Sequence, residues 1–155
     1  MKTISADRTN QNFKYEVAGH PGGENLRLCF SCGTCTATCP VFHVDSGYNP
    51  RKLIRMILLG LRKEVLSSKA IWLCARCYAC TAHCPQKVSF ADIMVVLRDL
   101  AVREGYAPRD LPEKIEKISD AAHAFRRDCI NLVSGAPSPS REAIAAGAQK
   151  AVEQL

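Results

Sequence analysis

Long apolar runs are scarce in this sequence of 155 residues. A helix that crosses a bilayer needs about 20 consecutive apolar residues, and the best candidate, residues 53–61, is short and contains Arg55. The N-terminus carries Lys2, Asp7 and Arg8 with no apolar stretch behind them, which is not the pattern of a secretory signal. We therefore expect a soluble, cytoplasmic chain without a membrane span.

Strand patterns are also scarce. Apolar residues alternate only at Phe13, Tyr15 and Val17. This predicts either a short extended segment, such as an arm on a partner, or a loosely ordered terminus. Elsewhere apolar residues recur at helical spacing, for example Ile118, Ala122 and other residues up to Leu132. The sequence therefore predicts an all-α fold.

Helix-start signals organise most of the chain. They are Asn49 with Pro50, Ser89 with Asp92, and Asp110 with Glu113. Residues 20–23, His-Pro-Gly-Gly, are turn residues and predict where the ordered domain begins. We expect a flexible N-terminal arm over 1–23, a helical domain over 24–107 and a C-terminal helical extension over 108–155.

Motifs that handle substrates are missing. The sequence contains no Gly-rich dinucleotide fingerprint, no phosphate loop, no flavin motif and no Ser-His-Asp set suggested by spacing. We therefore expect no catalytic residues on this chain, so that any catalysis would need another chain.

Cysteine, by contrast, is abundant: the chain has nine. Eight fall into two runs of identical spacing, C-x2-C-x2-C-x3-C-P, and in a cytosolic chain such clusters favour metal binding over disulfides. The first run contains Cys29, Cys32, Cys35 and Cys39, and the second contains Cys74, Cys77, Cys80 and Cys84. This spacing is that of proteins with two [4Fe–4S] clusters.

The spacing also predicts how the two clusters share their ligands. Three cysteines at x2 spacing wrap a tight loop around one cube, whereas the x3 step and the proline turn the chain away, so the fourth thiolate comes from the other run. The expected ligands are Cys29, Cys32, Cys35 and Cys84 for the first cluster, and Cys74, Cys77, Cys80 and Cys39 for the second. Cluster assembly and folding should then be coupled.

Other interpretations of the cysteines fit less well. Structural zinc sites use paired C-x2-C units, and thiols this close would form strained disulfides. Cys129 lies on an apolar helical stripe and is expected to pack as a small hydrophobe. We expect His83 to lie near a cluster without binding it, or to lie at the surface. We expect Trp72 and Tyr78 to shield a cluster from water.

The formal charge of +6 is misleading for the loaded chain. Eight thiolates add eight negative charges and two oxidised cores restore four positive ones, which leaves about +2. Nucleic-acid binding, which needs a strongly basic face, is therefore not expected.

The two runs and the helical spacer resemble the C subunits of heterodisulfide reductases. The resemblance covers about residues 24–107 and rests on the C-x2-C-G-x-C form of the first run, the Asn-Pro-Arg helix start and a short chain with little attached. It implies an α-helical ferredoxin fold and a complex in which a flavoprotein, the A subunit, passes electrons to this chain. The resemblance further implies that this chain passes them to the B subunit, which reduces a disulfide with a Cys-Cys motif absent here.

Three other functions remain open. The chain resembles less closely the iron–sulfur subunits of other flavin-dependent dehydrogenases, which carry further domains not found here. A stand-alone ferredoxin-like carrier fits the same cysteines, as does a regulatory protein that uses its clusters structurally or as a redox sensor.

Overall fold

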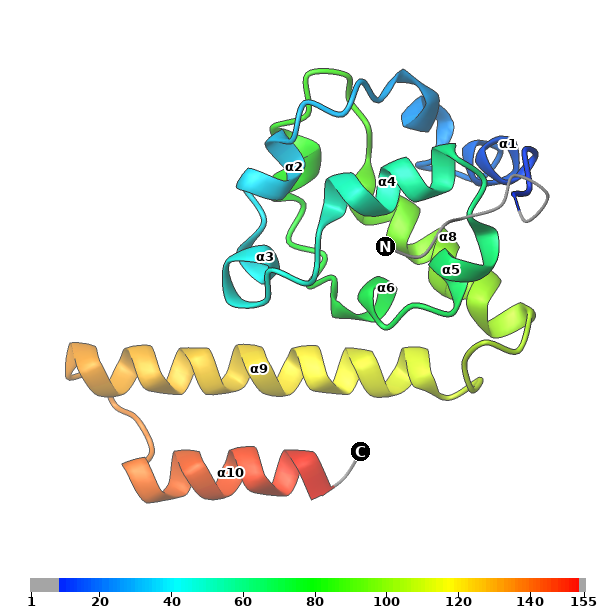
Figure 1. The fold of residues 1–155 in the computed structure, drawn as a ribbon. Coiled ribbons are helices and arrows are strands. Elements are labelled where there is room, and N and C mark those ends of the chain that lie inside the picture. The colour runs from blue at the N-terminus through cyan, green and yellow to red at the C-terminus, as the bar shows by residue number, and fades with distance from the viewer. Residues whose placement is uncertain (1–8, 154–155) are drawn as a thin grey trace. The chain divides into compact units, whose positions relative to one another are not determined.

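A computed structural model describes residues 9–153 (Figure 1). The chain divides into two compact units, residues 1–108 and 109–155. The predicted all-α class is confirmed, since the described part of each unit contains helices and no strand. Within residues 9–153 no helix combines the length and the apolarity required to cross a membrane.

The first unit consists of short helices around one longer helix. Its elements are α1 (Phe13–Ala18), the 3-10 helix η2 (Glu24–Leu28), α2 (Thr34–Ala37), α3 (Pro40–Val44), α4 (Pro50–Leu58), α5 (Arg62–Leu66), α6 (Ala70–Leu73), α7 (Ala79–Ala82) and α8 (Phe90–Arg103). Helix α8 contacts α1, α5, α6 and α7. Its residues Phe90, Ile93, Met94 and Leu97 are almost wholly buried, and each such side chain contributes about 1.5–3 kcal/mol through the hydrophobic effect.

Both alternatives for Phe13, Tyr15 and Val17, an extended segment and a loosely ordered terminus, are wrong. These residues lie in α1, and Phe13 and Val17 face the core with no exposed surface, while Tyr15 is half exposed. Residues four apart share a helix face, so the pair Phe13 and Val17 fits a helix as well as an alternating strand. The part of the predicted flexible arm over residues 1–8 lies outside the described residues.

The helix signals around α4 are confirmed. The Asn49 side chain accepts a hydrogen bond from the Lys52 amide at 3.0 Å, and Pro50 occupies the first turn. Gly60 follows α4 with φ +74°, and a Cβ there would lie 2.4 Å from the Asn10 carbonyl oxygen. The Asn10 amide donates to the Gly60 carbonyl at 2.8 Å, so this glycine permits a close contact that fixes the start of the described chain.

The capping boxes expected at Ser89 and Asp110 are wrong in detail. Helices α8 and α9 begin beside these residues, but neither side chain caps its helix. Asp110 instead forms an ion pair with Lys114 at 3.2 Å. Neither helix start therefore depends on a side-chain cap, and Pro112 lies in the first turn of α9.

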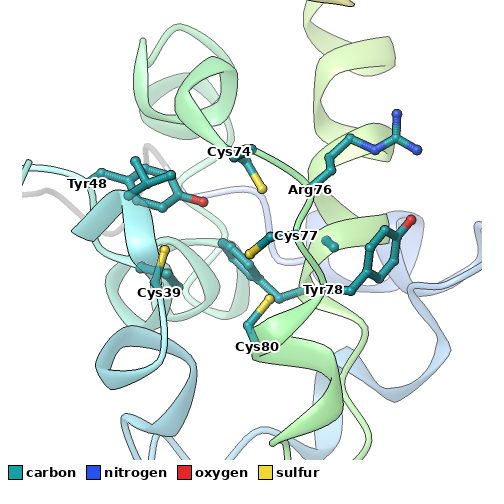
Figure 2. A pocket seen from close by; sticks show the side chains of 12 residues that line it. Cys39, Tyr48, Cys74, Arg76, Cys77, Tyr78 and Cys80 are labelled. Atoms are coloured by element: carbon teal, nitrogen blue, oxygen red, sulfur yellow. The ribbon is translucent and has the colours of Figure 1, made fainter. Parts of the chain in front are cut away.

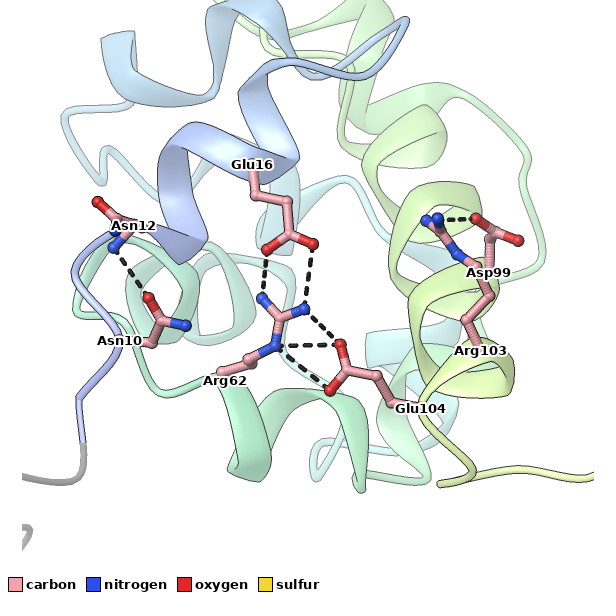
Figure 3. A network of polar contacts seen from close by, with 7 residues as sticks. All are labelled: Asn10, Asn12, Glu16, Arg62, Asp99, Arg103 and Glu104. Atoms are coloured by element: carbon pink, nitrogen blue, oxygen red, sulfur yellow. Dashed lines mark hydrogen bonds and ion pairs between the residues drawn. The ribbon is translucent and has the colours of Figure 1, made fainter.

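A charged network joins three helices of the first unit (Figure 3). The Arg62 guanidinium on α5 binds Glu16 of α1, with Nη2 to Oε1 at 3.0 Å, and it binds Glu104 after α8, with Nε to Oε1 at 3.1 Å. The hydrogen bond from Arg62 lowers the pKa of the Glu16 carboxyl. Hydrogen bonds to Glu16 and Glu104 likewise raise the pKa of Arg62. The network therefore ties the chain on both sides of the cysteine runs to one side chain.

The second unit is a pair of helices, α9 (Leu111–Ser134) and α10 (Arg141–Glu153), which contact one another (Figure 1). Gly135 ends α9 in the left-handed conformation, with φ +74°. The apolar stripe expected on α9 is not a core: none of its residues is buried, and Phe125 is about half exposed. Cys129 is only half-buried, so its predicted place in a packed core is wrong.

Candidate iron-sulfur site

The two cysteine runs adopt the same backbone conformation. Ser31 and Arg76, each two residues after the first cysteine of a run, have φ values of +60° and +49°. Gly33 and Tyr78, each four residues after it, have φ values of +91° and +59°. Successive amides in such turns form a concavity that suits anionic groups, including iron–sulfur cores.

Three of these four positions are not glycine. A left-handed conformation costs about 1–2 kcal/mol for an ordinary residue, and such strain concentrates at functional sites. Each loop then enters a one-turn helix, α2 or α7, and these two helices contact each other. The repeated sequence therefore folds into two similar loops that lie side by side.

Two cavities lie between the runs, and each receives cysteines from both. Figure 2 shows the cavity that holds most of the second run, called the second-run cavity; the other is the first-run cavity. The sulfurs of Cys74, Cys77 and Cys80 and the sulfur of Cys39 enter it from opposite sides. The second-run cavity is lined by Cys39 together with Cys74, Cys77 and Cys80, and the first-run cavity by Cys84 together with Cys29, Cys32, Cys35 and Cys80. The last cysteine of each run thus lies with the first three of the other run, which is the distribution that crossed ligation requires.

The cavities adjoin and share an apolar wall. Phe90, at the start of α8, lines both, and so does Cys80. Ile54 and Val88 complete the apolar lining of the first-run cavity. Since both are buried, they keep water from that side of the sulfurs.

Burial differs between the cysteines of each cavity. Cys39 and Cys80 are 8 % exposed, whereas Cys32 and Cys77 are exposed. Burial raises the pKa of the Cys80 thiol to about 11, with a smaller effect from the charge of Cys74. A hydrogen bond with the Thr34 hydroxyl, at 3.4 Å, lowers the pKa of the exposed Cys32 thiol. Each cavity therefore has one cysteine that reaches the surface.

The donor set fits an iron–sulfur core. At least four cysteine sulfurs line each cavity, and thiolates are the ligands of such cores. In residues 9–153 no three His, Cys, Asp or Glu side chains are placed to hold one metal ion. The four thiolates of a cube bind four different irons, so they lie farther apart than the ligands of a single metal ion. The Val88 amide also donates to Cys84 Sγ at 3.3 Å, the type of contact that tunes a cluster.

Arg98 of α8 supports the second run from behind. Its side chain is 8 % exposed, and its guanidinium donates to the carbonyl oxygens of Ile71 at 2.8 Å, Trp72 at 3.2 Å and Cys74 at 2.8 Å. It also lies over the Trp72 ring, 5.7 Å from its centroid. One buried cation therefore fixes the chain where it enters the second run.

Tyr48 lies in the wall of the second-run cavity. It is 1 % exposed, and its hydroxyl oxygen is buried without a hydrogen-bond partner among the described residues. Burial is the main cause that raises its pKa far above the ordinary value, followed by the nearby sulfur of Cys74. The hydroxyl is therefore a neutral donor that faces sulfur ligands.

Sequence reasoning missed Tyr48 and Arg98. Arg98 had a signal, because it lies on the apolar face of α8 between Met94 and Ala101, where a charge needs buried partners. Tyr48 had none, since its position in the cavity depends on the loop before α4. Of the two aromatic residues beside the second run, Tyr78 lines the second-run cavity, whereas Trp72 contacts Arg98.

The basic residues and histidines near the runs have separate positions. His83 is exposed, and its Nδ1 lies 2.9 Å from the Ala79 carbonyl oxygen, so it is at the surface. Arg51 lines the first-run cavity. Together with Lys52 and Arg55, it also lines an open hollow beside that cavity. All three basic side chains are exposed.

Comparisons with known proteins agree with this site. The model of a family described as "4Fe-4S dicluster domain" matches residues 25–88, which include both runs. The C subunit of an H(2):CoB-CoM heterodisulfide,ferredoxin reductase from Methanothermobacter thermautotrophicus is 40 % identical over 85 residues, 55 % of this chain and 45 % of that protein. The C2 subunit of an H(2)/formate:CoB-CoM heterodisulfide,ferredoxin reductase from Methanococcus maripaludis is 33 % identical over 161 residues, 98 % of this chain and 86 % of that protein.

The extent of the match differs among these relatives. A protein from Archaeoglobus profundus, named as similar to the C subunit of heterodisulfide reductase, is 36 % identical over 110 residues, 70 % of this chain and 58 % of that protein. The chain spans about half the length of the Methanothermobacter relatives. The matched share of this chain therefore ranges from about half to nearly all of it.

Proposed function

The chain belongs to the family of heterodisulfide reductase C subunits, and we propose that it is the iron–sulfur electron-transfer subunit of a heterodisulfide reductase-like complex. It receives electrons from a flavoprotein, the A subunit, which contains the flavin. It delivers them to the B subunit, which reduces the disulfide. The observation that carries the proposal is the pair of adjoining cavities, each lined by the first three cysteines of one run and the last cysteine of the other. Such a pair suits passage of electrons through the chain rather than chemistry on a substrate.

Each cavity holds one [4Fe–4S] cluster in this proposal. Cys29, Cys32, Cys35 and Cys84 bind the first-run cluster, and Cys74, Cys77, Cys80 and Cys39 bind the second-run cluster. When bound, these clusters supply one-electron oxidation and reduction. The protein's own part is to supply thiolates, exclude water through Phe90, Ile54 and Val88, and hold the two loops together.

The exposed cysteines supply an entry and an exit. Cys32 lies at the surface edge of the first-run cavity and Cys77 at that of the second-run cavity. A partner that docks at either edge comes close to a ligand sulfur without unfolding the core. The buried Cys80 lines both cavities, so the two cluster sites adjoin inside the protein between these exposed edges.

Catalysis itself is assigned to another chain. All eight patterned cysteines are used as ligands in this proposal, so that no iron of a cube is open to a substrate. The relatives carry names of CoB-CoM heterodisulfide reductases, and we propose a disulfide of this general class as the terminal acceptor. The complex is proposed to be cytoplasmic, without a nucleic-acid partner.

The test is anaerobic purification of the chain from its host with an affinity tag, followed by identification of bound proteins and by a reductive titration. We expect a flavoprotein and a protein with Cys-Cys motifs to copurify, and the clusters to be reduced reversibly. An isolated chain with reversible clusters would instead support a stand-alone carrier. Clusters that resist reversible reduction would contradict electron transfer and favour a structural or sensing role.

A further inference from the structure

The Tyr48 hydroxyl is a buried donor that lacks an acceptor. The residue precedes α4, and its backbone is fixed by a hydrogen bond from its amide to the Asp45 carbonyl at 3.0 Å. Its side chain is 1 % exposed, and its oxygen meets no partner in the described part of the chain. Because a buried hydroxyl without a partner is destabilising, an acceptor is expected at the place where it points.

That place is the second-run cavity. Figure 2 shows the Tyr48 oxygen directed into the space between the sulfurs of Cys39 and Cys74, which line the cavity with it. Thiolate sulfur accepts hydrogen bonds and donates none, whereas a neutral phenol is a good donor. The hydroxyl and the sulfurs are therefore complementary when the cysteines bind a cluster.

We propose that Tyr48 is a positioning residue whose O–H donates a hydrogen bond to the Cys74 sulfur and raises the reduction potential of the second-run cluster above that of the first-run cluster. The inference rests on the proposed function. Reduction adds one negative charge to the cluster and its thiolates, so a donor to sulfur stabilises the reduced form more than the oxidised form.

The first-run cavity has no equivalent donor. Its lining contains no tyrosine, and the Thr34 hydroxyl lies 3.4 Å from the exposed Cys32 sulfur. A hydrogen bond at an exposed position competes with water and has a smaller effect than one in a buried site. The structure therefore favours unequal potentials, with the higher one at the second-run cluster.

Tyr48→Phe tests the proposal, because it removes one oxygen atom and leaves the ring in place. We expect the equilibrium constant for reduction of the second-run cluster to fall roughly fivefold to tenfold, which is a shift of about 40–60 mV to lower potential at 59 mV per tenfold for one electron. The potential of the first-run cluster should not change. Both are measured by EPR-monitored redox titration of the anaerobically purified chain, with signals assigned by Cys32→Ser and Cys77→Ser.

Tyr78→Phe is the matched control. Tyr78 lines the same cavity, but its hydroxyl points away from the sulfurs and donates to Asp92 Oδ1 at 2.9 Å. This variant should leave the second-run potential unchanged. A second measurement does not depend on the folding of Tyr48→Phe: 3-fluorotyrosine placed at position 48, a stronger donor, should raise the same potential.

The outcomes separate the inference from the proposed function. Two reversible clusters with a second-run potential that ignores both changes at position 48 would overturn the role of Tyr48 and leave electron transfer intact. An equal shift of both clusters, or an equal shift in Tyr78→Phe, would also overturn it. Clusters that are not reversibly reduced would overturn the proposed function and this inference with it.

Discussion

Replacing Arg98 with methionine should destabilise the first unit strongly, because one buried side chain bonds three parts of the chain that enter the second run. The guanidinium donates to the carbonyls of Ile71, Trp72 and Cys74 over 2.8–3.2 Å. Methionine fills much of the same volume, but it leaves these carbonyls without that donor. Removal of the cation also removes its desolvation cost, which offsets part of the loss.

The expected magnitude follows from these opposing effects. Three hydrogen bonds from a charged donor contribute about 1.5–3 kcal/mol each, and recovered solvation together with the second lone pair of each carbonyl reduces the sum. We expect the free energy of unfolding to fall by about 3–5 kcal/mol, as for a broken buried charged network. Arg98→Lys keeps the charge but has no planar fork, so we expect a smaller loss of about 1–3 kcal/mol.

The assay is urea unfolding of the anaerobically purified chain, followed by far-UV circular dichroism and by cluster absorbance. Arg103→Met is the control, because Arg103 lies on the same helix with its side chain 54 % exposed and pairs with Asp99 at 2.8 Å. A surface pair of this kind contributes about 0–1 kcal/mol. A loss for Arg98→Met no larger than that for Arg103→Met would show that the three buried hydrogen bonds of Arg98 do not stabilise the first unit.

Three further predictions concern the ligands, a tight contact and pH. Cys39→Ala should remove chiefly the second-run cluster, because Cys39 lines that cavity; EPR that shows loss of the first-run cluster alone would contradict crossed ligation. Gly60→Ala should cost about 2–4 kcal/mol of unfolding free energy, since its Cβ would lie 2.4 Å from the Asn10 oxygen, whereas Gly105→Ala, with φ +75° in open space, should cost only about 1–2 kcal/mol; equal costs would show that the Asn10 contact is loose. The pKa of Glu16 is lowered from 4.5 by Arg62, so its stabilisation is present above pH 4.5 and is lost as the pH falls through the folded-state pKa; the stability difference between the original chain and Glu16→Gln should therefore shrink on acidification, and a difference that grows would contradict the assignment.

Much of the fold could be predicted, because its signals are local. Asn49 and Pro50 start α4, and Gly60 ends it, through contacts within a few residues. The helix at residues 13–18 was missed because Phe13, Tyr15 and Val17 are apolar at every second position, while only Phe13 and Val17 are buried. A short segment of this kind fits both periods, and contact with the rest of the unit decides between them.

The candidate site divides in the same way. Spacing alone predicted the eight cysteines and their crossed sharing, since the x3 step and proline are local features. The residues behind the ligands were not predictable, because Tyr48 and Arg98 reach the second run across 26 and 24 residues of sequence from Cys74. Such residues are identified by the cavity they line or the carbonyls they bind, and both depend on tertiary packing.

Electron transfer on two clusters can be measured by a coulometric reductive titration of the anaerobically purified chain, with its iron content determined on the same sample. We expect about eight irons per chain, four for each core, and two reversible one-electron steps with unequal potentials. About four irons with a single step, or iron that cannot be reduced and reoxidised, would contradict it.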